Sequence, residues 1–239
     1  MTNLTEHHHA SEGSNSRTVE LARSLLAVSP QPANVKFHGS SYHFVKRLAD
    51  LTIAAVALLV LFPLFLVIAA LIYLTDRGPV LYKQVRVGQD GAYFDFFKFR
   101  SMHLNADELR VHLLSQSDAK GHAFKMKKDP RITKVGRVLR KFSLDEMPQL
   151  LSVIKGDMSI VGPRPHLPSE VELYRPEQRI RLGVKPGLLC LREISGRSHL
   201  SFEEWVRSDV EYVQSRNLLM DLKIFLLAIP AVLSGKGAY

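Results

Sequence analysis

One uncharged, strongly apolar run, from Leu51 to Leu74, dominates the hydropathy pattern of the chain. An α-helix rises about 1.5 Å per residue, so this run can form a helix about 36 Å long, which exceeds the roughly 30 Å hydrocarbon core of a bilayer. A buried helix of a soluble domain is the alternative, but such helices rarely stay uncharged over this length. The run therefore predicts a membrane segment.

Basic residues flank this run at both ends: Lys46 and Arg47 precede it, and Arg77 and Lys83 follow it. The positive-inside rule then places both ends in the cytoplasm, which a straight crossing does not allow. Pro63, near the middle, removes a backbone hydrogen bond and bends a helix. We predict a re-entrant, proline-broken membrane helix; the alternative is a kinked helix that spans the bilayer.

The remainder of the chain has the short elements of a globular domain. The β-branched and aromatic residues of 80–87 and 93–99, separated by a glycine-bounded turn, predict a β-hairpin. Apolar spacing predicts several helices, and a basic stretch between the first two predicts a connector. The helices are expected over 105–116, 147–154, 170–182 and 202–216, and the connector over 117–142.

The last segment, 218–233, is apolar but has no uncharged run long enough to span a bilayer. We expect it to lie on the membrane surface or to pack on the domain. The expected fold class is α+β, mainly helical, with residues 1–40 as a flexible leader because they are rich in small and polar residues. Residues 41–77 then form the membrane helix with its flank, and residues 78–239 form a cytoplasmic domain.

The net charge of +9 lies entirely after residue 40, because the basic and acidic residues before it cancel. Excess positive charge on the folded part favours polyanions as partners: phosphate groups, nucleic acid or an anionic membrane face. Composition alone leaves the choice among them open. The single cysteine, Cys190, excludes an internal disulfide and a cysteine-rich zinc site.

The densest basic stretch runs from Lys125 to Lys141, and Asp129 is its only acid. Such a stretch is most often a solvated face or a contact with lipid headgroups. Two adjacent carboxylates, Asp145 and Glu146, follow directly. Ser143 and Glu146 have the spacing of a helix capping box, which is a purely structural explanation.

The same acidic pair also suits chemistry on phosphates. It lies at or just before a helix N-terminus, where anions are favoured. A carboxylate can approach a diphosphate only where guanidinium groups or a divalent cation cancel the repulsion. Arg164 is a candidate for such a group, because Pro163 and Pro165 fix the backbone on both sides of it. Alone, it could equally be an arginine in a rigid surface turn.

The order of these motifs, from Lys46 to Tyr239, resembles the bacterial sugar transferase family. Its members are monotopic phosphoglycosyl transferases that start glycan assembly on polyprenyl phosphate. The likeness covers about four fifths of the chain and leaves out the first 40 residues. Besides the proline-containing apolar run, the matching pieces are Lys46-Arg47 with Asp50, Gly78-Pro79-Val80, Gln84-Val85-Arg86-Val87-Gly88, Phe97-Lys98-Phe99-Arg100-Ser101-Met102, Asp129-Pro130-Arg131-Ile132-Thr133, Leu139-Arg140-Lys141, Ser143-Leu144-Asp145-Glu146, Gly156-Asp157-Met158-Ser159, Gly162-Pro163-Arg164-Pro165, Lys185-Pro186-Gly187, Ser195-Gly196-Arg197 and Leu222-Lys223-Ile224.

The resemblance implies a two-step transfer. Asp145 would attack the β-phosphate of a nucleotide diphosphate sugar, expected to be a UDP-sugar, and form a covalent phosphosugar intermediate that polyprenyl (undecaprenyl) phosphate then displaces. Glu146 would be its partner, and both would hold Mg²⁺. The resemblance further implies a place on the cytoplasmic face of the bacterial inner membrane, exopolysaccharide synthesis, contacts with anionic lipids and no nucleic acid. The substrate-binding residues that it implies are Lys98, Arg140, Arg164, Arg197 and Asp221.

The chain departs from the family pattern at three points. Phe62 stands where a serine often precedes the membrane proline, and residues 188–193 differ from the usual continuation of the Lys185-Pro186-Gly187 motif. A large amino-terminal membrane region, common in the family, is not expected here, which makes this the minimal type. A membrane-attached protein that binds polyanions without turnover is the alternative function, although such a binder gains nothing from Asp145 and Glu146 beside its cations.

Overall fold

The computed structural model describes residues 39–113, 126, 129–194 and 201–233. The predicted leader, apart from its last two residues, lies outside this part. So does Arg197, one of the expected substrate-binding residues.

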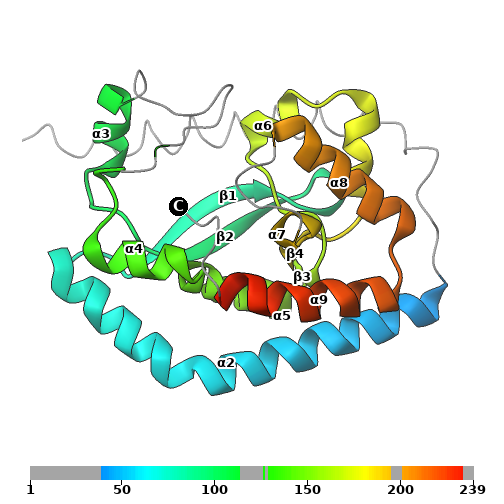
Figure 1. The fold of residues 1–239 in the computed structure, drawn as a ribbon, viewed down its shortest axis with the longest axis horizontal. Coiled ribbons are helices and arrows are strands. Elements are labelled where there is room, and N and C mark those ends of the chain that lie inside the picture. The colour runs from blue at the N-terminus through cyan, green and yellow to red at the C-terminus, as the bar shows by residue number, and fades with distance from the viewer. Residues whose placement is uncertain (1–38, 114–125, 127–128, 195–200, 234–239) are drawn as a thin grey trace, which may run out of the picture.

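The apolar run forms one long helix, α2 (Ser40–Asp76), which is long and apolar enough to cross a membrane. Pro63 lies inside it without interrupting it, so the two arms form a single continuous helix rather than a broken one. The helix curves, with its middle turned away from the other elements (Figure 1). It ends at Arg77, whose backbone adopts the left-handed conformation and donates to the carbonyl of Tyr73.

The predicted hairpin is confirmed. Strands β1 (Leu81–Val87) and β2 (Tyr93–Phe99) pair antiparallel, with Leu81 opposite Phe99 and Val87 opposite Tyr93. The short 3₁₀ helix η1 (Gln89–Gly91) connects them. Phe94 and Phe96 alternate with the exposed Asp95, so one face of β2 points into the core.

A second, parallel pair of strands was not predicted: β3 (Ser159–Val161) and β4 (Gly187–Leu189). Each has three residues, too few for an alternating pattern to stand out. Two glycines permit a close approach beside this pair, because a Cβ atom on Gly187 would lie 2.0 Å from the nitrogen of Gly162.

The helices agree in part with the expectations. The connector contains an unpredicted helix, α4, capped by Thr133, whose hydroxyl accepts from the backbone N–H of Gly136 at 2.8 Å. The predicted helix over 170–182 is wrong, because the chain breaks before Pro176 into two shorter pieces. The helix over 202–216 is confirmed. The elements are α3 (Ala106–Leu113), α4 (Lys134–Lys141), η3 (Leu144–Gln149), α5 (Leu150–Lys155), α6 (Pro168–Glu172), η4 (Pro176–Gly183), α7 (Leu191–Ile194), α8 (Phe202–Ser215) and α9 (Leu218–Leu233).

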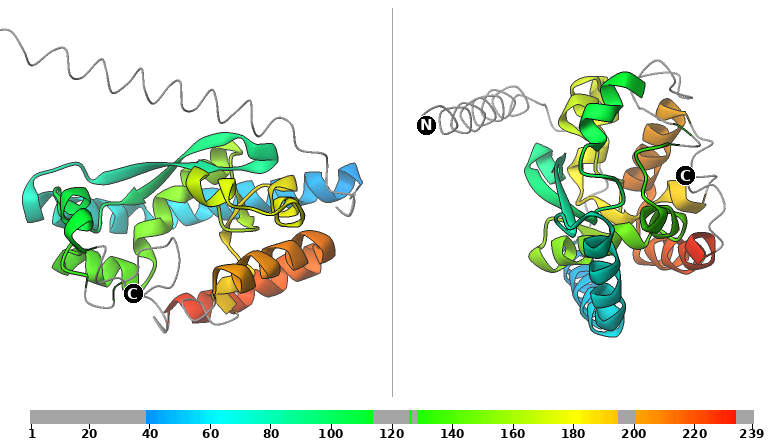
Figure 2. Two further views of the ribbon diagram at one scale, coloured as in Figure 1. Left: turned by 90° about the horizontal axis from the view of Figure 1, so that it is seen from above. Right: turned by 90° about the vertical axis from the view of Figure 1, so that its left-hand side faces the viewer.

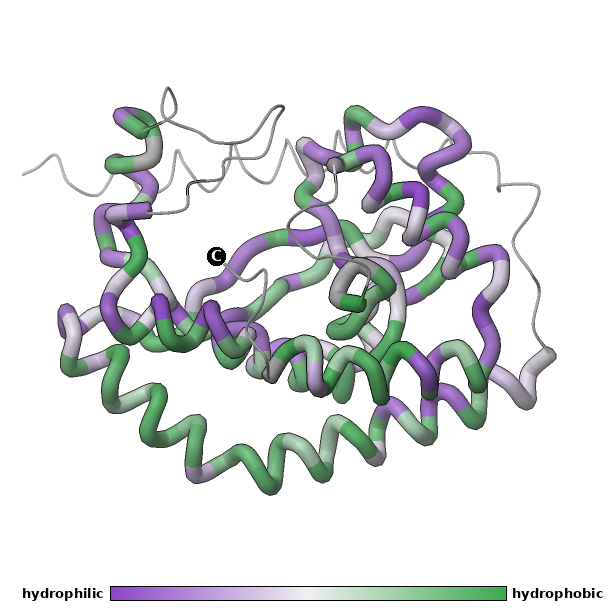
Figure 3. Tube along the Cα trace, in the orientation of Figure 1, coloured by the Kyte–Doolittle hydropathy of each residue, from purple (hydrophilic) through white to green (hydrophobic). Residues whose placement is uncertain are grey.

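Both halves of α2 pack on the rest of the chain. Ala54, in the first half, belongs to the main core together with residues of β2, α5 and α9. Ile68 and Ile72, in the second half, pack with Phe99 and Leu139. The middle of α2 projects beyond the other elements in the right-hand view of Figure 2. Much of α2 and of α9 is green in Figure 3, the colour of hydrophobic residues.

Candidate active site

The acidic pair lies in η3, immediately before α5, as the sequence predicts. Ser143 precedes the pair in the left-handed conformation, with φ of 53°, and makes no side-chain capping bond. The capping-box explanation for this motif is therefore not realised. A non-glycine residue in this region of backbone space is uncommon, and such residues concentrate at functional sites.

Two cations from separate segments hold Glu146: Lys98 from β2 and Arg164 from the loop after β3. Lys98, on β2, donates to Oε1 at 2.8 Å. Arg164 donates through Nη1 to Oε2 at 2.9 Å and through Nη2 to Oε1, which is the bidentate arrangement that arginine favours with carboxylates. The proline-flanked arginine therefore binds Glu146 of the acidic pair directly, which the sequence did not predict.

Asp145 is in a different situation. Its side chain is buried, yet no group of the described residues donates a hydrogen bond to its carboxylate. Asp145 therefore differs from Glu146: the charges of Lys98, Arg140 and Arg164 act on it, but no side chain of the described residues holds it by a hydrogen bond.

Burial and charge separate the pKa values of the two carboxyl groups. Burial raises the pKa of Asp145, with the negative charge of Glu146 adding to the rise and Lys98 opposing it. Burial also acts to raise the pKa of Glu146, but the charges of Arg164 and Lys98 outweigh it and hold that pKa well below its usual range. Two titratable groups whose pKa values are pushed apart are a common sign of divided chemical roles.

Two further arginines contribute charge to the site. Arg140, on the last turn of α4, favours the ionised form of Asp145. Arg86, on β1, was not predicted as a site residue, although it lies in one of the quoted motifs. Burial and the neighbouring charge of Arg164 lower the pKa of Arg86 to about 10, while the charge of Glu146 acts in the opposite direction.

A buried ion pair between Arg181 and Asp209 contacts the backbone of Arg164. Arg181, on η4, donates to the backbone carbonyl of Arg164 at 2.6 Å and also to Asp209 of α8. Both side chains of this pair are 1% exposed. Sequence analysis missed it because its members come from distant segments and neither lies in a quoted motif.

Asp221 is not joined to the acidic pair by any contact of the described residues. It accepts hydrogen bonds from Tyr212 at 2.6 Å and from Lys46 at 2.8 Å, and so ties α9 to the start of α2. Of the expected site residues, the structure brings together Asp145, Glu146, Lys98, Arg140 and Arg164.

The acidic pair can hold Mg²⁺ only in an arrangement in which the protein supplies one or two carboxylates. No group of three or more histidine, cysteine, aspartate or glutamate side chains that could hold a metal occurs among the described residues. Mg²⁺ at phosphate sites commonly uses one or two carboxylates and takes its other oxygens from water and from the substrate. The free carboxylate of Asp145 beside Glu146 fits that arrangement.

Comparison with known proteins gives the same family as the sequence motifs. The model of the family "Bacterial sugar transferase" matches residues 41–235. The galactosyl transferase CpsE of Streptococcus agalactiae is 42% identical over 208 residues, which cover 86% of this chain and 46% of the relative. The exopolysaccharide production protein ExoY of Sinorhizobium fredii is 43% identical over 198 residues, which cover 81% and 88%.

Two further relatives are named for undecaprenyl phosphate. The undecaprenyl-phosphate galactose phosphotransferase of Salmonella typhimurium is 41% identical over 83% of this chain and 42% of its own length. The UDP-glucose:undecaprenyl-phosphate glucose-1-phosphate transferase of Caulobacter vibrioides is 39% identical over 81% of this chain and 72% of its own length. This chain thus spans less than half of two of these four relatives and most of the other two. With the family match covering most of its length, the chain belongs to the bacterial sugar transferase family.

Proposed function

We propose that the chain transfers a sugar-1-phosphate from a nucleotide diphosphate sugar, a UDP-sugar, to undecaprenyl phosphate, in exopolysaccharide assembly. The names of relatives in Salmonella typhimurium and Caulobacter vibrioides support this reaction. The main support for the proposal is that the two carboxylates of the acidic pair have different surroundings. Glu146 is fixed by two cations, while Asp145 stands among the same cations without a hydrogen bond from the described residues.

In the proposed first step, a carboxylate oxygen of Asp145 attacks the β-phosphorus of the donor. The bond from that phosphorus to the bridging oxygen breaks, and the nucleoside monophosphate leaves with its electron pair. In the second step, a phosphate oxygen of undecaprenyl phosphate attacks the same phosphorus and releases the carboxylate of Asp145. Lys98, Arg140 and Arg164 lower the repulsion between carboxylate and phosphate in both steps.

Asp145 and Glu146 would hold Mg²⁺ in this reaction. When bound, the ion supplies charge neutralisation on the diphosphate oxygens. Glu146, held in place by Lys98 and Arg164, fixes the backbone next to Asp145 and keeps a negative charge at the site. A binder without turnover is not favoured, because an acidic pair at the centre of its cations would weaken its hold on a polyanion.

The proposal also includes a re-entrant course for α2 at the cytoplasmic face of the inner membrane. The ends of α2 are tied to the same domain: near the start Asp50 accepts from Ser159 at 3.0 Å, and at the end Asp76 pairs with Arg100. A helix of this length that crossed the bilayer would carry its two ends to opposite faces. The apolar side chains exposed in its middle include Leu59, Val60 and Leu66.

Sidedness labelling tests this course. Single cysteines replace Ser41 and Lys83, which flank the apolar run and are exposed, in a chain with Cys190→Ser. We expect a membrane-impermeant thiol reagent to label both positions in inverted membrane vesicles and neither in intact cells with a permeabilised outer membrane. Labelling of the two positions from opposite faces contradicts the re-entrant course.

The reaction is tested with Asp145→Asn, which keeps the size of the side chain and removes the nucleophilic oxygen. Membranes are incubated with several nucleotide sugars and undecaprenyl phosphate, and released nucleoside monophosphate is measured. We expect a loss of at least about a thousandfold, because removal of a nucleophile typically costs that much or more. Asp95→Asn, the same change at an exposed carboxylate, is the control and should retain activity.

A second measurement looks for the intermediate. Without acceptor, mass spectrometry of the wild-type protein should show an added phosphosugar on the peptide that contains Asp145. Release of a nucleoside diphosphate, or an active enzyme that never carries this adduct, would falsify the two-step mechanism.

A further inference from the structure

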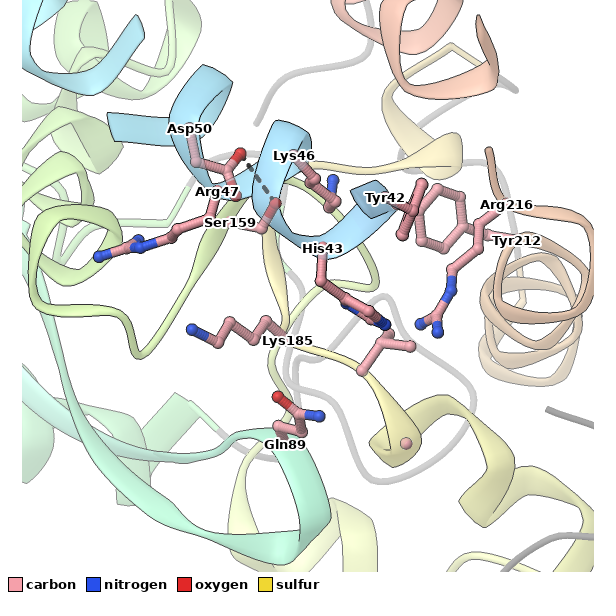
Figure 4. A pocket seen from close by; sticks show the side chains of 12 residues that line it. Tyr42, His43, Lys46, Arg47, Asp50, Gln89, Ser159, Lys185, Tyr212 and Arg216 are labelled. Atoms are coloured by element: carbon pink, nitrogen blue, oxygen red, sulfur yellow. Dashed lines mark hydrogen bonds between the residues drawn. The ribbon is translucent and has the colours of Figure 1, made fainter. Parts of the chain in front are cut away.

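A cavity of about 320 Å³ lies at the start of α2, where several segments of the chain meet. Its basic lining residues are His43, Lys46 and Arg47 from α2, Lys185 from the segment before β4, and Arg216 at the end of α8. Figure 4 shows these side chains around the cavity. The volume is at the lower end of the range for small-molecule sites.

Positive charge in this cavity exceeds negative charge. Among the described residues, Asp50 is the only acidic one in the lining, and its carboxylate accepts hydrogen bonds from Ser159 at 3.0 Å and from the backbone of Ile160 at 2.9 Å. Lys46 has a counter-charge in Asp221. Arg47 has only neutral partners among the described residues, because it donates to two backbone carbonyls at the end of α5.

Lys185 has no hydrogen bond or ion pair within the described part of the chain. Its Nζ and the Nη2 of Arg47 both lie 3.6 Å from the point where a Cβ on Gly156 would stand. Two like charges therefore converge on one place. Burial and the charge of Arg47 lower the pKa of Lys185, which is the response of a cation that lacks a sufficient counter-ion.

The first turn of α2 adds to this field. It contains no acidic residue, and no side chain in the described part of the chain caps it. The free N–H groups at the start of a helix carry partial positive charge and favour an anion. The side chains of Tyr42 and His43, from this turn, line the cavity.

This cavity differs from the site around the acidic pair. Lys98, Arg140 and Arg164, the cations at Asp145 and Glu146, do not line it. Two of its own cations, Lys46 and Arg47, lie directly before the apolar run of α2. Phosphate headgroups of a membrane occupy the corresponding depth if that run enters lipid.

We propose that the cavity is a second phosphate-binding site, with Lys185 as its principal ligand-contacting cation. The ligand is a phosphate monoester or diester, either the headgroup of an anionic lipid or a soluble phosphate. Several convergent cations together with a helix N-terminus suit the spread charge of a phosphate group. Binding here needs no turnover, so it stands apart from the proposed transfer reaction.

The test measures binding to the purified full chain in neutral detergent, with no donor sugar present. Inorganic phosphate and dihexanoyl phosphatidate, a short-chain soluble lipid, are titrated, and the rise in melting temperature gives the affinity of each. Because the acidic-pair site can also bind phosphate, the comparison of wild type with Lys185→Gln carries the result. We expect Lys185→Gln to lose at least about tenfold in affinity, the size of one charge-assisted contact.

Two variants control this comparison. Lys83→Gln makes the same change at an exposed lysine outside the cavity and should bind like wild type. Lys185→Arg keeps the charge and should retain binding. Tighter binding of phosphatidate than of inorganic phosphate identifies a lipid headgroup as the ligand, and equal binding identifies a soluble phosphate.

A measurement on the wild-type chain guards against a variant that fails to fold. With ¹³C-methylated lysines, the Lys185 signal should titrate at a higher pH when either probe is bound, since a bound anion favours the charged amine. The proposal is wrong if neither probe raises this pKa, or if a folded Lys185→Gln binds both probes as wild type does. Neither result depends on whether Asp145 forms an intermediate.

Discussion

The chain has two clusters of basic side chains that differ in how their charge is balanced. Around the acidic pair, Lys98 and Arg164 both donate to Glu146. In the cavity at the start of α2, Arg47 donates to carbonyls and Lys185 has no partner within the described residues. The first cluster is organised around the carboxylate of Glu146. In the second, the basic side chains outnumber the carboxylates of the lining.

This difference shows that the density of basic residues along the sequence is a poor guide to free charge. The stretch up to Lys141 is the most basic, yet Arg131 within it forms a buried pair with Asp129. Lys185 stands between Val184 and Pro186, in no basic run at all, and nevertheless has no ion pair within the described residues, while burial and the charge of Arg47 lower its pKa. Whether the charge of a basic residue is compensated depends on which carboxylates the fold places near it.

The largest expected effect concerns the buried ion pair between Arg181 and Asp209, which contacts the backbone of Arg164. Asp209→Asn leaves the Arg181 guanidinium without its counter-charge, and breaking a buried ion pair from one side typically costs about 3–5 kcal/mol. We expect the free energy of unfolding, measured by chemical denaturation in detergent, to fall by that amount. Glu203→Gln is the matched control, because its pair with Arg175 is exposed and its loss should cost less than about 1 kcal/mol. Equal losses in the two variants contradict the structural role of Arg181 and Asp209.

The next effect concerns the ion pair between Arg164 and Glu146. Arg164→Met removes the bidentate partner of Glu146 and a cation from the approach to phosphate. We expect kcat/KM for sugar-phosphate transfer to fall by about a hundredfold, as for the loss of one charge-stabilising donor. Arg175→Met, at an exposed arginine, should leave the rate unchanged. If Arg164→Met keeps full activity, Arg164 has no part in the chemistry.

The smallest effect is a shift in pH dependence. Asp145 acts as a nucleophile only when ionised, so the rate falls as the pH drops through its raised pKa. The charge of Arg140 holds that pKa down in part, and Arg140→Gln removes this help. We therefore expect the acidic limb of the kcat/KM profile to move to higher pH, and Arg137→Gln, at an exposed position of α4, to leave it in place. A shift to lower pH is incompatible with this account.

Local patterns were sufficient for much of the fold. The hairpin follows from alternating residues around a turn, and α8 follows from helical spacing after Ser201, whose side chain caps it. The acidic pair was correctly placed at the start of a helix, although the capping bond of Ser143 that its spacing suggested does not form. These features depend on residues close together in the sequence.

Long-range contacts could not be predicted in the same way. Arg181 and Asp209 meet only after η4 packs on α8, and nothing near either residue signals the other. Asp221 matched a family position, but only the fold shows that it holds Lys46 and Tyr212. The cavity likewise combines residues from opposite ends of the chain, so no short motif encodes it.

The contact between Gly162 and Gly187 has a consequence for the reactive carboxylates. Gly162 begins the segment that carries Arg164, and a methyl group on Gly187 would collide with its backbone. Because only Pro163 separates Gly162 from Arg164, the resulting displacement would be passed on to the guanidinium that donates to Glu146. The absence of a side chain at Gly187 thus helps to set the position of a charged group at the acidic pair.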